Sequence, residues 1–139
     1  MDHRRAYIDS SVVLRRLLGQ PGAVTGWARW RPLASELMEV EVRRALHRLN
    51  LGGDLSAEET GLRIGELNAL LGAFDRVPVS RPILSRAGGP FATPVKTLDA
   101  IHLATALAWS EYKEEELLFL THDRQLATAA RACGLATYP

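Results

Sequence analysis

Two acidic residues follow short apolar runs of the sequence, at positions where strands are predicted to end. Asp9 closes the run AYID, and Thr121 and His122 separate Asp123 from the run LLFL. In open parallel sheets, ligands bind beyond the carboxyl ends of the strands, so both carboxylates are predicted to face a binding crevice. If the two strands are neighbours, Asp9 and Asp123 converge at one edge of the sheet. Capping of the following helix is the alternative explanation for Asp123.

Asp99 and Glu41 each add a carboxylate to this candidate site. Asp99 begins the apolar helical pattern LDAIHLATALAW, and no Lys or Arg lies three or four residues onward to pair with it. Because burial of an unpaired carboxylate is costly, a functional site is favoured over an acid that only interacts with the helix dipole. Glu41 borders the apolar stripe of its helix, whereas Glu39 can pair with Arg43 on an exposed face. An ion pair with Arg44 is the alternative for Glu41.

A site that gathers four carboxylates requires a compensating cation, because like charges a few ångströms apart raise one another's pKa. Ligands that are all oxygen favour a hard divalent ion such as Mg²⁺ or Mn²⁺. An anionic substrate would complete the coordination of that ion, and a phosphodiester is such a substrate. Arg44 and Arg48 flank Glu41 on the same side of its helix, so both are candidates for binding neighbouring phosphates.

Strand-like and helical segments alternate along almost the whole chain. The expected strands are short and apolar, and the expected helices have serine caps, glycine stops or apolar residues at helical spacing. Strands are expected at 6–9, 32–35, 74–80, 117–121 and 135–139. Helices are expected at 10–19, 36–50, 54–72, 96–110 and 123–134, and the segment 81–95 is expected to hold one helical turn and a Gly/Pro-rich loop.

This alternation predicts one α/β domain over residues 1–139, with three layers: a short, mostly parallel central sheet and helices on both of its faces. The single cysteine, Cys133, excludes an internal disulfide and a Cys-rich zinc module, and it fits a reducing cytoplasm. No run resembles a signal peptide or a membrane span, so we expect a soluble cytoplasmic protein. A net charge of +1 argues against a strongly basic nucleic-acid coat protein.

Four segments of the sequence resemble the PIN-domain toxins of the VapC-like type. They are DSSVV after a strand, VEVRRAL on a helix, TLDAIHLATAL on a buried helix, and LTHDRQLATAA with a trailing GL. The likeness covers almost the entire chain in order and spacing, and TLDAIHLATAL together with THDRQL is its most specific part. It implies a PIN-like fold and a metal-dependent endoribonuclease, the toxic half of a toxin–antitoxin pair. It also implies a homodimer and a small antitoxin partner that fills the active groove.

The resemblance assigns roles to the four acidic residues that the spacing argument had collected. It implies that Asp9 and Asp99 bind Mg²⁺ or Mn²⁺ most directly. Glu41 and Asp123 would complete the shell, directly or through water, and position the attacking water. Hydrolysis of RNA in this family leaves a 5′-phosphate and a 3′-hydroxyl.

Four further residues surround this acidic set in the expected site. Ser10 and Thr121 are expected to orient the ligands by hydrogen bonds, as a second layer around the metal. His102 lies one helical turn after Asp99, and we expect it to be a hydrogen-bonded core residue and not a metal ligand. His122 departs from the family pattern, which more often has an aromatic residue there.

Three alternative functions make distinct demands on the sequence. A haloacid-dehalogenase-like phosphatase needs a second Asp two residues after the first, where this chain has Ser11. A receiver-like domain needs a Lys near the end of a late strand, and LLFLTHD contains none. A PIN-like domain that binds RNA without cutting it, or that serves a housekeeping role, is the remaining alternative to a nuclease.

Overall fold

Five short strands form one parallel sheet in the computed structural model, which describes residues 4–139. The strands are β1 (Arg4–Ile8), β2 (Trp30–Ser35), β3 (Asp75–Val77), β4 (Leu118–Leu120) and β5 (Ala136–Tyr138). Their order in the sheet is β3-β2-β1-β4-β5, and every neighbouring pair is parallel. The predicted fold class is therefore confirmed. Residues 1–3 of the expected domain 1–139 lie outside the described residues.

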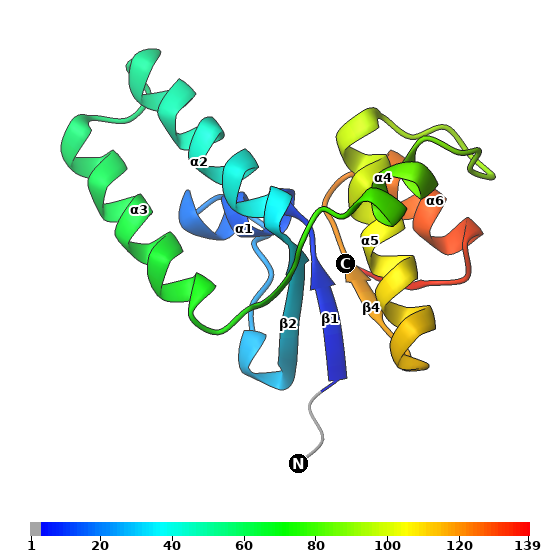
Figure 1. Ribbon diagram of the computed structural model, residues 1–139. Helices are drawn as coiled ribbons and strands as arrows, with labels where there is room; N and C mark the ends of the chain where they lie inside the picture. The colour runs from blue at the N-terminus through cyan, green and yellow to red at the C-terminus, as the bar shows by residue number, and fades with distance from the viewer. Residues whose placement is uncertain (1–3) are drawn as a thin grey trace.

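Six α-helices of the described chain cover the two faces of this sheet (Figure 1). They are α1 (Ser10–Leu17), α2 (Glu36–Leu51), α3 (Ala57–Leu71), α4 (Arg81–Ala87), α5 (Thr97–Lys113) and α6 (Arg124–Ala132). Helices α1, α2 and α3 cover one face, and α5 and α6 cover the other, with α4 packed on α5. A short 3₁₀ turn, Trp27–Arg29, leads into β2.

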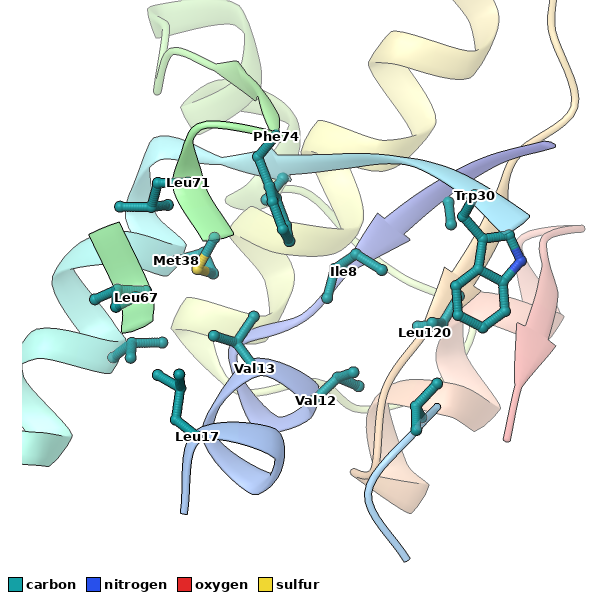
Figure 2. Packing of buried hydrophobic residues seen from close by; sticks show 14 of the residues in the cluster. Ile8, Val12, Val13, Leu17, Trp30, Met38, Leu67, Leu71, Phe74 and Leu120 are labelled. Carbon is teal, nitrogen blue, oxygen red and sulfur yellow. The ribbon is translucent and has the colours of Figure 1, made fainter. Parts of the chain in front are cut away.

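Alternate residues of the central strand β1 contribute to two separate cores. Ala6 and Ile8 pack beneath α1, α2 and α3, whereas Tyr7 packs beneath α5 and α6. Figure 2 shows the first of these cores, to which the strands contribute Ile8 and Leu120 and helix α2 contributes Met38. Because residues 6–8 of β1 are buried on both faces of the sheet, this part of the strand is a continuous apolar run, whereas Arg4 and Arg5 precede it.

The strand order changes direction between β1 and β4: β2 and β3 are added on one side of β1, and β5 is added on the far side of β4. From β1 the chain runs through α1 to β2, on one side, and from β4 it runs through α6 to β5, on the other side. A crevice therefore forms at the carboxyl ends of β1 and β4, the position at which open α/β sheets bind ligands. The register pairs Ile8 with Leu120, so the residues that follow these two strands are brought together.

The expected elements are all present, with differences at their ends. The sheet extends β1 back to Arg4 and β2 back to Trp30, and the expected helical turn after residue 80 is the seven-residue helix α4. Ser56 caps α3 by accepting a hydrogen bond from the Glu59 backbone N–H at 3.0 Å, as its position predicts. Edge strand β3 ends at Val77, directly before a proline that could not continue the ladder.

Surface features also follow the sequence pattern. Glu39 and Arg43 form the predicted i,i+4 ion pair, with 3.1 Å between the charged atoms. Over residues 4–139, none of the helices has the length and apolar character that crossing a membrane requires.

Candidate active site

Asp9 lies directly after β1, where the sheet opens into the crevice. Its backbone is extended, with φ −73° and ψ 153°, and its side chain makes no capping hydrogen bond to α1. The carboxylate instead turns toward β4: Oδ2 accepts hydrogen bonds from Ser11 Oγ at 2.7 Å and from Thr121 Oγ1 at 2.9 Å. Only 3% of Asp9 is exposed, and these two hydroxyls compensate for the loss of hydration at that oxygen. The expected contact of Thr121 with the site is thus present.

The serine that hydrogen-bonds Asp9 is Ser11, whereas Ser10, for which such a role was expected, makes no such bond among the described residues. Both serines lie in the first turn of α1, and successive helical residues differ by about 100° in direction, so only one of them faces β4. Ser11 Oγ donates its single proton to Asp9 and accepts from the His122 backbone N–H at 3.1 Å. Ser11 therefore ties the end of β1 to the loop that follows β4, and His122 takes part in this link through its backbone.

Asp123 is both a helix cap and a member of the crevice. Its Oδ1 accepts from the Leu126 backbone N–H at 3.0 Å, which caps α6. Its own N–H donates to Thr121 Oγ1 at 3.0 Å. Thr121 consequently joins the carboxylate of Asp9 to the backbone of Asp123, and the two strand-end acids belong to one hydrogen-bonded unit.

Asp99 occupies the first turn of α5, half-buried beside the other acids. Burial, together with the negative charges of Asp9 and Asp123, raises the pKa of the Asp99 carboxyl from 3.8 to about 6. His102 opposes this rise and Glu41 adds to it, so the other three predicted carboxylates all act electrostatically on Asp99. The structure therefore brings together the acidic set that the sequence predicted.

Glu41 reaches the crevice from the second turn of α2, and its partner is His102 of α5. The His102 Nε2 donates a hydrogen bond to Glu41 Oε1, and the same nitrogen lies 3.9 Å from Asp9 Oδ1. No ion pair between Glu41 and Arg44 is present among the described residues, so the alternative partner proposed for Glu41 is not the one it has.

His102 is fully buried, as expected of a core histidine, and both ring nitrogens have partners. Its Nδ1 lies 2.7 Å from the Tyr7 hydroxyl oxygen. Burial lowers the pKa of His102, but the hydrogen bond that His102 donates to Glu41 and the charges of Glu41, Asp9 and Asp99 outweigh this effect, and the net shift of the pKa is upward. Burial raises the pKa of Tyr7 well above its usual value, so Tyr7 keeps its proton. The contact between His102 and Glu41 was missed in the sequence, where the only signal was the placement of His102 one turn after Asp99.

The donor set of the crevice fits a hard divalent cation. It contains four carboxylates, and the repulsion among them, which adds to the effect of burial in raising the pKa of Asp99, would be relieved by a positive ion. Among residues 4–139, no group of three or more His, Cys, Asp or Glu side chains stands ready to enclose a metal ion. Carboxylate oxygens are nonetheless the ligand type that hard divalent ions take in proteins, often with several waters kept.

Basic side chains lie along two grooves that adjoin the crevice. The first has a volume of about 520 Å³ and is lined by Ser11, Arg15 and Arg48, with other residues of α1 and α2. The second, of about 430 Å³, runs from Thr121 along α6 and is lined by Arg124 and Arg131. Of the two arginines expected at the site, Arg48 lines the first groove, and Arg44 is exposed on α2 outside the lining of both grooves.

The sequence is similar to a known protein family and to named proteins. Residues 6–132 match the family model of the PIN domain. Ribonuclease VapC46 of Mycobacterium tuberculosis is 32% identical over 134 residues, covering 94% of this chain and 93% of that protein. Ribonuclease VapC47 of the same organism is 27% identical over 131 residues, with the same coverage of both chains.

Solved structures of low sequence identity share the fold. A toxin–antitoxin complex from Klebsiella pneumoniae superposes with a TM-score of 0.63 at 17% identity, covering 96% of both chains. VapBC2 from Rickettsia felis, solved with a DNA fragment from its promoter, superposes with a TM-score of 0.66 at 9% identity, covering 96% of this chain and 97% of that one.

Proposed function

Because this chain belongs to the PIN-domain family, we propose that it hydrolyses RNA phosphodiesters with the help of Mg²⁺ or Mn²⁺ bound at the four carboxylates. The chain is a VapC-like ribonuclease of the toxin–antitoxin type. The observation that carries the metal-dependent mechanism is the convergence of Asp9, Glu41, Asp99 and Asp123 at the carboxyl ends of β1 and β4. Burial of Asp99, together with the charges of the other three, raises its pKa to about 6.

The chain's own residues divide the work of such a site. A divalent ion, when bound, lowers the pKa of a water and neutralises charge on the phosphoryl oxygens. Asp9 and Asp99 would hold it most directly. Glu41 and Asp123 would complete the shell and orient the attacking water in line with the leaving 3′-oxygen. Water adds to phosphorus and the 3′-oxygen departs with a proton, so the products are a 5′-phosphate and a 3′-hydroxyl.

Hydroxyl groups preorganise this acidic set. Thr121 and Ser11 both donate to Asp9 Oδ2, so that oxygen is fixed and the carboxylate has one settled orientation toward the crevice. Residues that orient metal ligands in this way are important for metal affinity and activity. We retain the second-layer role for Thr121, assign it also to Ser11, and give Ser10 no part in it.

Arginines beside the crevice would bind the phosphates on either side of the scissile one. Arg48 and Arg15 line the groove that contains Ser11, within reach of a strand that enters the site. Arg44 is exposed on the same helix, one turn before Arg48, and it would contact RNA outside that groove.

An antitoxin protein is the expected partner, and the basis for this is the pairing named in the related toxin–antitoxin structures. A homodimer is expected from the family resemblance. Since the substrate is cellular RNA, the proposed site of action is the cytoplasm. Expression of this chain alone should arrest growth, and co-expression of a short neighbouring reading frame should restore it. Harmless expression without any partner would favour a housekeeping PIN domain.

Cleavage of a structured RNA by the purified protein tests the activity itself. We expect cleavage with Mg²⁺ or Mn²⁺, no cleavage after addition of a chelator, and no cleavage by a folded Asp99→Asn variant. RNA binding without cleavage in any metal would support the alternative, a PIN-like RNA-binding domain. Equal cleavage by wild type and Asp99→Asn would refute the site assignment.

A further inference from the structure

A buried chain of hydrogen bonds leads from the backbone of β2 to the carboxylate of Glu41. The Ser35 N–H donates to the Tyr7 hydroxyl at 3.2 Å, the Tyr7 hydroxyl lies 2.7 Å from His102 Nδ1, and His102 Nε2 bonds Glu41 Oε1. Ser35, Tyr7 and His102 are each 0% exposed. The chain therefore connects the sheet, α5 and α2 without contact with solvent until it reaches Glu41.

The direction of the last hydrogen bond is fixed by the chemistry of its acceptor. An ionised carboxylate can only accept, so the proton between His102 and Glu41 belongs to Nε2. The other ring nitrogen, Nδ1, can accept from the Tyr7 hydroxyl or donate to it. In both cases the imidazole keeps the same orientation, and the arrangement does not depend on the charge of His102.

Packing leaves the His102 ring little freedom to turn. The Tyr7 ring stacks on Phe119 at a centroid distance of 5.1 Å with an angle of 7° between the planes. The edge of Tyr7 meets the His102 ring at 5.9 Å and 71°. His102 itself lies on the buried face of α5, one turn after Asp99. A rigid imidazole thus presents its N–H at a fixed place beside the acidic set.

Glu41 depends on this N–H for its orientation. Its side chain is 18% exposed, and His102 is its hydrogen-bond donor among the described residues. Arg44 follows Glu41 by three residues on the same helix, at a spacing that permits an ion pair. Without His102, the carboxylate would be free to rotate away from the crevice and toward that arginine.

We propose that His102, anchored by Tyr7, is a positioning residue that holds the Glu41 carboxylate in the active crevice. This inference rests on the proposed function, since it assigns Glu41 a place in the metal site. His102 does not contact the substrate or bind the ion. It acts as the supporting hydrogen-bond donor of a ligand, and removal of such a group lowers metal affinity or activity by about 10–100-fold.

Four variants separate positioning from general damage to the core. His102→Leu removes the donor, His102→Gln keeps an N–H at a similar distance from the backbone, and Tyr7→Phe removes only the anchoring hydroxyl. Leu67→Val is the matched control, because it removes one methylene from the other core, beneath α3, and leaves every polar atom of the chain and the packing of Tyr7 in place. Circular dichroism and thermal unfolding establish that each variant is folded.

Two readouts are made on the full-length folded proteins: Mn²⁺ affinity by electron paramagnetic resonance, and kcat and KM for RNA cleavage. His102→Leu should weaken Mn²⁺ binding and lower kcat by about 10–100-fold, with KM for RNA nearly unchanged. Tyr7→Phe should show a smaller loss of the same kind, and His102→Gln should recover part of it. Leu67→Val should match wild type in both measurements.

A third readout separates this inference from the proposed function. In the metal-free protein, the ¹³C shift of the Glu41 carboxylate and the ¹⁵N shifts of the His102 ring should move in Tyr7→Phe and not in Leu67→Val. A wild type that neither binds Mn²⁺ nor cleaves RNA would refute the proposed function, and these shifts would still decide whether His102 holds Glu41. Wild-type Mn²⁺ affinity, kcat and Glu41 shift in folded His102→Leu or Tyr7→Phe would overturn the positioning role.

Discussion

Replacement of Asp99 by asparagine should make the metal-free protein more stable while it abolishes cleavage. The Asp99 carboxyl is half-buried close to Asp9 and Asp123, and its raised pKa means that the folded protein holds the ionised form at a cost. Asparagine has the shape of the protonated acid and carries no charge. The variant therefore removes the charge repulsion between Asp99 and its acidic neighbours. It also removes a carboxylate that the proposed metal site needs.

The size of this effect follows from the shift in pKa. The carboxyl titrates at about 6 in the folded protein and has an ordinary value of 3.8. At about 1.36 kcal/mol per pKa unit, the full difference is at most about 3 kcal/mol. Because Asp99 is partly open to solvent, screening reduces the expected gain to roughly 1–2 kcal/mol. For a domain of this size, that is a rise in Tm of roughly 3–8 °C.

The pH dependence of the gain has a definite sign. A carboxyl whose pKa is higher in the folded state binds more protons when folded, so the wild type loses stability as pH rises from about 4 through about 6. Asp99→Asn does not undergo this loss. Its advantage over wild type should be small at pH 4 and fully developed above pH 7.

Chemical denaturation in a chelating buffer at pH 4 and pH 8 measures this difference. Glu66→Gln is the matched control, since it removes one carboxylate from an exposed ion pair with Arg63 at 3.2 Å and should change stability by less than about 0.5 kcal/mol. Addition of Mn²⁺ should stabilise wild type more than Asp99→Asn. An Asp99→Asn variant that is less stable than wild type at pH 8 without metal would refute the electrostatic account of the site.

Three other predictions concern the hydrogen bonds and titration of the site. Ser11→Ala should lower the rate of RNA cleavage by about 10–100-fold, because Asp9 loses a hydrogen-bond donor. Ser10→Ala should leave the rate unchanged. Equal rates for the two variants would contradict the placement of Ser11. Asp123→Asn should keep the α6 cap but lose RNA cleavage activity. Asp123→Ala should lose the activity and also about 0.5–2 kcal/mol of unfolding free energy, measured in urea. An active Asp123→Asn variant would show that Asp123 serves only as a cap. Mn²⁺ affinity, measured by titration, should fall as pH drops through about 6, because protonated Asp99 cannot serve as a ligand, and a flat profile from pH 5 to 8 would argue against that role.

Much of the fold was predictable because its determinants are local in the sequence. Short apolar runs mark the strands, Ser56 and the glycine stops mark helix ends, and alternation of the elements predicts a parallel sheet. The convergence of Asp9 with Asp123 also followed from the sequence, since both come after strands and the carboxyl ends of parallel strands share one edge.

The contacts that the sequence did not reveal depend on distances between elements. Glu41 and His102 are 61 residues apart and meet only because α2 and α5 approach the same edge of the sheet from opposite faces. Tyr7 reads as one apolar residue in a buried strand, and nothing local indicates that its hydroxyl bonds His102. Ser10 and Ser11 are neighbours of identical chemistry, and the rotation of α1 relative to β4 decides which of them reaches Asp9.

The ends of the cut RNA give the most direct test of a water-based, metal-dependent hydrolysis at this site. RNA recovered after expression of the wild-type chain and of Asp99→Asn would be sequenced with methods that distinguish end chemistry. We predict new 5′-phosphate and 3′-hydroxyl ends in the wild type and none in the variant. Cuts that end in 2′,3′-cyclic phosphates, or that appear equally with Asp99→Asn, would contradict the account.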